Sequence, residues 1–352
     1  MIIGILFFGL LILVHELGHF SAARAFGVRV TEFSLGMGPR LLKKKKGETL
    51  YSLKAIPFGG SVLMEEDEGE SDDPRAFVNK KPWKRLIILA AGAVMNILCG
   101  VIIMAVITSM TPNIGSTRVA EFRDEGISQE QGLMVGDQIL RVGGRRAFTS
   151  MDVLFLANRG ALGYADFVVR RNGETIRLDG IALLEDEEEG FYYLDFWLAL
   201  EPERTVGVWA RETLGQSASM ARMIWLSLFD LVTGQFTLRD ISGPVGLVAV
   251  VADGAQQVQQ EAAQRNWDAV RASLSWLLLL LAMISINIGI FNLLPIPALD
   301  GGRIFFCLVE MIFRKPIPKK FEGWVHGIGF ALLMAFMVVI MFTDIWGLIT
   351  GR

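Results

Sequence analysis

The chain has 352 residues, enough for two or three domains, and 52% of them are hydrophobic while only 20% are charged. This composition is unusually apolar for a soluble protein, so an ordinary soluble protein is not expected. The formal net charge of −3 indicates little about partners, and we expect no nucleic-acid partner. The two cysteines, Cys99 and Cys307, lie in or beside apolar runs, so a cysteine-based metal site is excluded and a disulfide is not expected.

Four apolar runs are each long enough to cross a bilayer, which takes about 20 residues. We therefore predict transmembrane helices at residues 1–26, 83–110, 273–296 and 323–349. Four buried helices of a large soluble core are the alternative, but the third and fourth runs have almost no polar face. A cleaved signal peptide is also not favoured, because positive charge follows the first run instead of preceding it.

Lysine and arginine residues indicate the orientation of these helices. They concentrate after the first run, before the second, and between the third and fourth, so these segments should be cytoplasmic. Residues 111–272 and both chain termini should then lie on the extracytoplasmic side.

The first run contains the stretch LVHELGHF, which holds two of the three histidines of the chain. His15, Glu16 and His19 form the pattern H-E-x-x-H, which places both imidazoles on one face of a helix, where they can bind one metal ion. Glu16 can take a proton from a metal-activated water. Ionisable groups within a membrane helix are costly and usually mark function. The alternative is a histidine pair that bonds to neighbouring helices.

Residues 27–82 are predicted to form a β element on the cytoplasmic side, followed by an acidic loop. Apolar and polar residues alternate in VRVTEF and TLYSLKAI, which is typical of strands, and glycine-rich turns separate them. The acidic run at 65–73 is expected to be a solvated loop.

Residues 115–200 are predicted to form a soluble α+β domain. RVAEF and DQILRVGG are typical of strands, MDVLFLANRG of a short helix, and Asn172-Gly173 of a hairpin turn. Residues 205–272 are interpreted as an amphipathic extracytoplasmic connector. Its first helical stretch can lie on the outer membrane surface or pack on the external domain, and the sequence does not decide between them.

Catalytic zinc takes three protein ligands and keeps one position for water, so a third ligand must come from elsewhere. Asp300, in NLLPIPALDGGR, is the better candidate. Pro295 and Pro297 should unwind the chain at the cytoplasmic end of the third run, which is tolerated only inside protein or beside a water-filled cavity. Residues 297–322 are therefore predicted to be a loop and a cytoplasmic connection. His326 is the other possible ligand, but an interfacial or helix-pairing role is favoured for it.

HELGH in a first apolar helix, together with NLLPIPALDGG in a later one, resembles the site-2 protease family of intramembrane zinc metalloproteases, in particular its bacterial RseP-type branch. The resemblance covers nearly the whole chain. It implies a multi-pass α-helical protein of the bacterial inner membrane, with four transmembrane helices, a membrane-associated β element on the cytoplasmic side and an inserted extracytoplasmic α+β domain. The segment GLMVGDQILRVGGRRAF resembles a PDZ domain, of which one copy is visible.

The resemblance also implies roles for individual residues. The matched positions are the zinc ligands His15, His19 and Asp300, the catalytic Glu16, and the substrate-binding Asn287, Asn292 and Asn96. For the asparagines of the third run, hydrogen bonding between helices is the alternative. The second run has Ala93 where the family often has proline, which weakens the match of Asn96.

The expected reaction is hydrolysis of peptide bonds within or near the transmembrane helices of single-span substrates in the lipid bilayer. The family suggests anti-sigma factors and remnant signal peptides. An edge strand within residues 30–64 can pair with an unwound substrate, and the PDZ-like domain can act as a size filter.

Two other functions are considered for this sequence: a membrane scaffold without activity, and a zinc protease for soluble substrates. The intact H-E-x-x-H pattern argues against the first, and the charge bias argues against the second.

Overall fold

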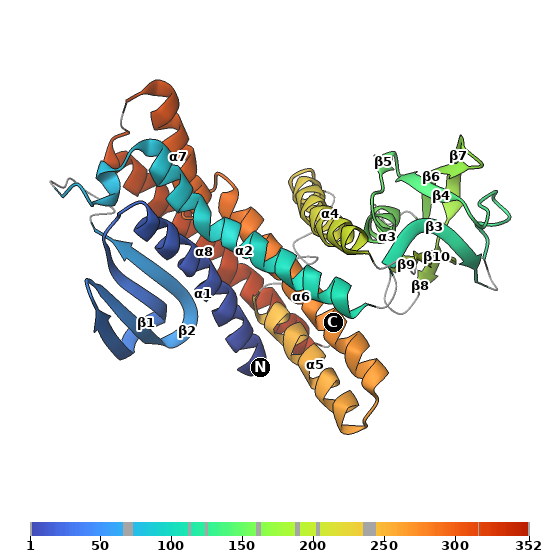
Figure 1. Cartoon of the computed structure of the whole chain (residues 1–352), viewed down its shortest axis with the longest axis horizontal. Coiled ribbons are helices and arrows are strands. Elements are labelled where there is room, and N and C mark those ends of the chain that lie inside the picture. Colours follow the sequence, from blue (N-terminus) through green and yellow to red (C-terminus); the bar gives the residue numbers. More distant parts are fainter. Residues whose placement is uncertain are drawn as a thin grey trace. The chain divides into compact units, whose positions relative to one another are not determined.

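The computed structural model describes residues 2–65, 73–111, 114–123, 126–159, 163–186, 191–201, 205–234, 244–315 and 317–350. The chain folds as two compact units, one made of Met1–Ile103 and Thr237–Arg352 and the other of Met104–Phe236. Figure 1 labels the helices and strands of both units.

The four predicted transmembrane runs are helices in the structure. They are α1 (Ile2–Ala25), α2 (Pro82–Met110), α6 (Trp267–Leu293) and α8 (Lys319–Thr350). Each contains a stretch long and apolar enough to cross a membrane, so the prediction of four candidate spans is confirmed. Helix α6 begins earlier than expected, because the side chain of Asn266 caps it by accepting a hydrogen bond from the Ala269 amide.

Small residues allow α2 to pack closely against both α1 and α6. A Cβ on Gly18 of α1 would collide with the Ala91 carbonyl of α2. A Cβ on Gly289 of α6 would lie 2.8 Å from the Ala93 carbonyl oxygen of α2. Such close approach of backbones is typical of helix packing in membranes. It puts the H-E-x-x-H helix and the third spanning helix on either side of the same segment of α2.

The predicted β element consists of two long strands, β1 (Val30–Lys46) and β2 (Thr49–Met64), and is followed by a short 3-10 helix, η1 (Phe77–Asn79). Phe33 of β1 pairs with both Tyr51 and Val62 of β2, so the start of β1 lies between two parts of β2. The last part of β2 is consequently an edge of this sheet, with no further strand beside it among the described residues. Most of the predicted acidic loop lies outside the described residues.

The segment 205–272, expected to be one connector, divides between the two units. Helix α5 (Pro244–Ala263) belongs to the first unit and packs on α6 and α1. Leu11 of α1, Val251 of α5 and Ile284 of α6 share one buried apolar cluster. The apolar side of this helix is therefore covered by spanning helices, which its amphipathic sequence alone could not indicate.

The predicted loop at 297–322 is wrong for most of its length, because residues Asp300–Phe313 form helix α7. The two prolines do end α6, and Ala298 has a φ of 78° in the turn that follows. The chain then re-enters a helix whose first residue is Asp300. Gly301 makes this possible, since a Cβ there would collide with the Leu294 carbonyl at the end of α6.

The second unit contains the predicted α+β fold. Its elements are β3 (Ile114–Phe122), β4 (Gln138–Val142), β5 (Arg145–Arg146), α3 (Ser150–Asn158), β6 (Tyr164–Arg171), β7 (Glu174–Ala182), β8 (Leu184–Asp186), β9 (Phe191–Tyr193), β10 (Phe196–Glu201) and α4 (Val206–Val232). The main sheet has the order β10-β3-β4-β6-β7, with β5 beside β4, while β8 pairs with β9. The β6–β7 turn has positive φ at Asn172 and Gly173, as the Asn-Gly signal predicts.

Helix α4 packs along α3, as one of the two interpretations of this stretch expects. The buried Ser219 hydroxyl donates a 2.9 Å hydrogen bond to Asp152, and Arg159 forms an ion pair with the buried Asp230. A buried polar network of this kind fixes one helix against the other. The polar residues of α4 thus face the α+β fold, while its large apolar side chains Trp225 and Phe229 are exposed.

Candidate metal centre

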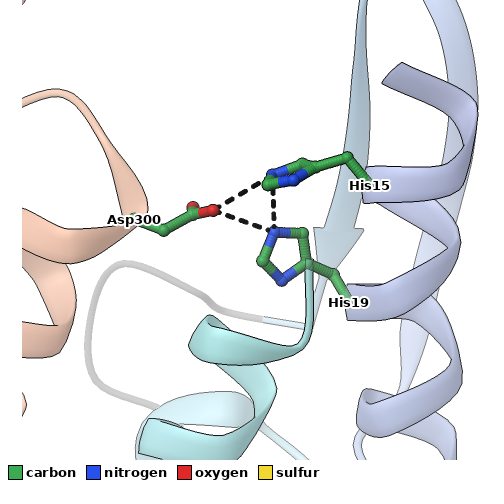
Figure 2. A group of neighbouring side chains, drawn as sticks. All are labelled: His15, His19 and Asp300. Atoms are coloured by element: carbon green, nitrogen blue, oxygen red, sulfur yellow. Dashed lines mark hydrogen bonds and ion pairs between the residues drawn. The ribbon is translucent and has the colours of Figure 1, made fainter. Parts of the chain in front are cut away.

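His15, His19 and Asp300 converge at one point within the first unit (Figure 2). The Oδ2 atom of Asp300 lies 3.0 Å from Nε2 of His15 and 3.2 Å from Nε2 of His19. The two Nε2 atoms lie 3.1 Å apart. The histidines are one turn apart on α1, and the aspartate is the first residue of α7, so residues 281 positions apart in the sequence meet here.

The spacing of these three atoms fits zinc. Ligands at 2.0–2.2 Å from a tetrahedral zinc ion lie about 3.3 Å from one another. The observed separations of 3.0, 3.1 and 3.2 Å are close to this value. Two imidazoles and a carboxylate are zinc ligands in catalytic sites that keep a fourth position for water. Among the described residues, this is the one group of three or more such side chains.

Groups of helix α2 contact the Nδ1 atoms of both imidazoles, which are the nitrogens that face away from Asp300. Nδ1 of His19 donates a 2.8 Å hydrogen bond to the Ile88 carbonyl, which leaves its Nε2 as the metal-binding atom. The Asn96 amide group lies 3.4 Å from Nδ1 of His15 and is fully buried. Its Oδ1 has no hydrogen-bond partner among the described residues, and exchanging the oxygen and nitrogen of the amide lets Oδ1 accept from Nδ1. Both imidazoles then direct Nε2 towards Asp300.

Gly92 of α2 forms the surface against which the two imidazoles lie. A Cβ at this position would be 2.8 Å from Nε2 of His15 and would collide with Nε2 of His19. Any larger residue would therefore occupy the space of the ligand atoms. Sequence reasoning missed Gly92, although the small-residue stretch AAGA at 90–93 is a visible signal of close helix approach.

The Asp300 carboxylate is held in its ionised form. Burial alone would raise its pKa, but its contacts with His15 and His19 outweigh burial and lower the pKa well below the ordinary value. Its place in the first turn of α7 adds a favourable interaction with the helix dipole. An ionised carboxylate is the form that binds a metal ion.

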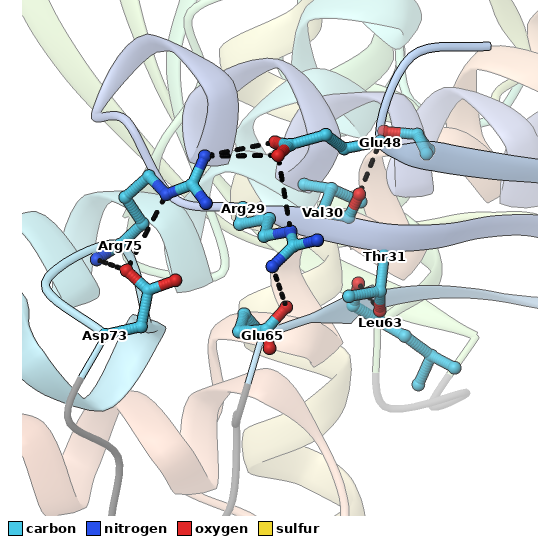
Figure 3. A network of polar contacts seen from close by, with 9 residues as sticks. Arg29, Val30, Thr31, Glu48, Leu63, Glu65, Asp73 and Arg75 are labelled. Carbon is cyan, nitrogen blue, oxygen red and sulfur yellow. Dashed lines mark hydrogen bonds and ion pairs between the residues drawn. The ribbon is translucent and has the colours of Figure 1, made fainter.

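Glu16 lies beside this group and against the edge of the β element. A Cβ on Gly60 of β2 would be 2.6 Å from Cγ of Glu16, so only glycine leaves room for this carboxylate. The polar network in Figure 3 holds the end of the same strand, where the Thr31 hydroxyl donates a 2.9 Å hydrogen bond to the Leu63 carbonyl. Arg29 adds a 3.5 Å ion pair with Glu65. The catalytic candidate and the last part of β2 are thus neighbours.

The remaining predicted residues lie outside the ligand group. Asn287 and Asn292 of α6 are half-buried, and no hydrogen bond joins either one to the three ligand candidates within the described part of the chain. The Oδ1 atom of Asn287 is buried, with no partner among the described residues. His326 is also not part of the group, since its Nδ1 accepts a hydrogen bond from the Ala298 amide.

Known proteins are similar to this chain over nearly its full length. The model of peptidase family M50 matches residues 3–336. A putative zinc metalloprotease of Clostridium acetobutylicum is 36% identical over 346 residues, which cover 98% of this chain and 96% of the relative. A putative zinc metalloprotease of Clostridium perfringens is 34% identical, with 98% of each chain covered. The regulator of sigma-W protease RasP of Bacillus subtilis is 27% identical, with 97% of each covered.

Proposed function

Because the chain belongs to peptidase family M50, the site-2 protease family, and is a zinc metalloprotease with four candidate membrane spans, we propose that it hydrolyses peptide bonds within or near the transmembrane helices of single-span membrane proteins. The observation that carries this proposal is the convergence of His15, His19 and Asp300 beside Glu16, inside the unit that contains the spanning helices. A zinc site at this position allows hydrolysis where bulk water is scarce.

The proposed zinc ligands are His15, His19 and Asp300. Zinc bound by them supplies a Lewis acid that polarises the scissile carbonyl and favours the ionisation of water near neutral pH. Glu16 acts as the general base, accepting the proton of the attacking water and passing it to the leaving amine. Gly60 has no Cβ, and this leaves the space that the Glu16 side chain occupies.

Substrate binding must replace the hydrogen bonds that an unwound transmembrane helix loses. The last part of β2, which has no further strand beside it among the described residues, passes Glu16 at Gly60 and offers backbone groups for strand addition. Asn287 and Asn292 are proposed to bind the substrate backbone, and the buried, unpartnered Oδ1 of Asn287 supports this role. For Asn96 we propose a different role from the one expected from the family, because its amide faces Nδ1 of His15: it orients that ligand.

The name of one relative supports a class of substrate. One relative carries the name regulator of sigma-W protease, which supports membrane-bound anti-sigma factors as substrates here, with remnant signal peptides as a second group. The lysine and arginine distribution supports a bacterial inner membrane location with both termini extracytoplasmic and the site towards the cytoplasm. The unit Met104–Phe236 would then be an extracytoplasmic PDZ-like domain that excludes substrates with bulky external parts.

The test is cleavage of a labelled single-span substrate by the purified full chain in detergent. Glu16→Gln is expected to lower kcat roughly a hundred- to ten-thousand-fold while zinc content stays near that of the wild type. A zinc chelator should abolish cleavage by the wild type, and added zinc should restore it. Cleavage that survives Glu16→Gln would overturn the assignment of the general base. A protein that binds zinc yet cleaves none of a panel of single-span substrates would favour the scaffold alternative.

A further inference from the structure

His326 of α8 contacts the turn that presents Asp300, although it lies outside the ligand group. The backbone N–H of Ala298, two residues before Asp300, donates a 3.0 Å hydrogen bond to Nδ1 of His326. An imidazole nitrogen that accepts carries no proton, so the neutral ring holds its proton on Nε2. The bond therefore joins α8 to the connection between α6 and α7.

Within the described residues, the other backbone N–H groups of this turn donate only to carbonyls of the turn itself. Its two prolines, Pro295 and Pro297, have no N–H to donate. Ile296 and Leu299 donate to carbonyls within the turn itself, at 2.7 and 3.2 Å. Ala298 has a φ of 78°, a left-handed conformation that residues with a Cβ rarely adopt. A conformation of this kind persists only where the surroundings fix it, and the bond to His326 is such a constraint.

The side chain of His326 is itself held in place. Its ring packs against Phe306 of α7, with 5.8 Å between ring centroids. A Cβ on Gly302 would lie 3.1 Å from Cε1 of His326, and a Cβ on Gly329 would lie 3.0 Å from the carbonyl carbon of Pro297. Glycine at these two positions lets α8 approach both the turn and the first turn of α7. The imidazole thus spans the junction of α6, α7 and α8.

The position of Asp300 depends on this junction. Its single Oδ2 atom must face both Nε2 atoms at 3.0 and 3.2 Å. Metal sites tolerate ligand displacements of only about half an ångström before affinity falls. Asp300 also has no side-chain cap before it, since the N-cap residue of α7 is Leu299, which makes no side-chain hydrogen bond. The local chain alone therefore does not fix the carboxylate.

From these contacts we infer that His326 is a positioning residue of the metal centre: by accepting the Ala298 N–H it fixes the turn that sets Asp300, and so helps to determine zinc affinity. This inference rests on the proposed role of Asp300 as a ligand. It gives a function to the third histidine that requires no direct contact with the metal. It also makes the packing of α8 against α7 a determinant of the centre.

The experiment compares His326→Asn with His326→Leu in the full chain carrying Glu16→Gln, so that no readout depends on proteolysis. Asparagine places Oδ1 where histidine has Nδ1 and can accept the same hydrogen bond, whereas leucine cannot. Zinc affinity is measured by competition with a chelator, and Co²⁺ absorption reports the ligand geometry. His326→Leu should weaken zinc binding about 10- to 100-fold and change the Co²⁺ spectrum. His326→Asn should restore both.

Two further variants separate the possible outcomes. Ile328→Ala, a change at an exposed position of the same helix, controls for general effects on α8 and should leave zinc affinity unchanged. Wild-type affinity and spectrum in His326→Leu, or equal losses in the leucine and asparagine variants, overturn the inference. If Asp300→Asn leaves zinc binding intact, the ligand assignment itself is wrong, and the role of His326 falls with it. If Asp300→Asn weakens binding and His326→Leu does not, only the role of His326 is overturned.

Discussion

The backbone carbonyl of Ile88 on α2 accepts a 2.8 Å hydrogen bond from Nδ1 of His19 on α1. A main-chain carbonyl is a fixed acceptor, so it sets both the tautomer and the rotation of this imidazole. Asn96, two turns further along α2, faces Nδ1 of His15. Helix α2 supplies no metal ligand candidate, yet it orients both histidines.

Gly92→Ala should destroy the metal centre without unfolding the protein. The added methyl would lie 2.8 Å from Nε2 of His15 and would fill the space in which the ligand atoms meet. Alanine is also a better helix former than glycine by about 1 kcal/mol, so the helix itself should not weaken. Zinc content, measured by elemental analysis of the purified variant, should fall to background.

The matched control for this substitution is Gly327→Ala on α8, where an added Cβ meets nothing within 4 Å. It should retain zinc and wild-type cleavage. Zinc bound with wild-type stoichiometry by Gly92→Ala would show that the imidazoles lie elsewhere than in the structure.

Asn96→Ala should lower zinc affinity about 10- to 100-fold, the usual effect of removing a residue that orients a ligand histidine. Asn96→Asp keeps an acceptor for Nδ1 of His15 and should recover most of the loss. The family-based expectation of substrate binding makes a different prediction, namely a raised KM with unchanged zinc affinity. Chelator competition and Michaelis kinetics on the same preparations decide between them, and a change in KM alone would reject the orienting role.

Each of the ligand candidates His15, His19 and Asp300 could be identified from sequence, and the signal for each is local. Histidines four residues apart share a helix face regardless of tertiary structure, and two prolines mark where the third spanning helix must stop. The four candidate membrane spans could also be predicted, because their apolar runs are longer than those of helices in soluble proteins. Signals of this kind are contained in a single segment.

What the sequence could not supply depends on contacts between segments. The group that accepts the hydrogen bond from His19 is the backbone carbonyl of Ile88. Every residue has such a carbonyl, so the residue type at position 88 does not predict this contact. The partner of Asn96 depends on how α2 is rotated against α1. Helix α7 was missed because the prolines before Asp300 favour a loop, while its packing on α6 through Gly301 appears only in three dimensions.

Arg85→Ala should destabilise the junction of α2 and α7. Nη1 of Arg85 donates a 2.8 Å hydrogen bond to Oε2 of Glu310, and both side chains are nearly inaccessible to solvent. The other oxygen of Glu310 accepts a hydrogen bond from the Ile317 amide, so the carboxylate is held in its buried position. Leaving such a charge unpaired costs about 3–5 kcal/mol. Thermal unfolding in detergent should show a clearly lower midpoint.

The double variant Arg85→Met with Glu310→Met provides the control for that experiment. Apolar replacement of both members of a buried pair is often neutral or stabilising, so the midpoint should return towards that of the wild type. A double variant as unstable as Arg85→Ala would mean that the geometry of the pair, not the unpaired charge, stabilises this junction.

The β element should open as the pH falls below the ordinary range for a glutamate. Hydrogen bonds from Arg40 come first among the causes that lower the pKa of Glu32, and a 2.7 Å bond from the Ser52 hydroxyl adds to them, while burial opposes. A lowered folded-state pKa means that this stabilisation is complete above the unfolded pKa of about 4.3 and is lost as the pH falls through the folded pKa. Limited proteolysis of β1 and β2 should therefore be unchanged between pH 6 and 8 and should accelerate towards pH 3.

The Glu32→Gln variant is the control, because its side chain has no proton to gain. It should be cleaved faster than the wild type at pH 7 and show little further acceleration at lower pH. Equal acid sensitivity of the two proteins would assign the opening to other carboxylates.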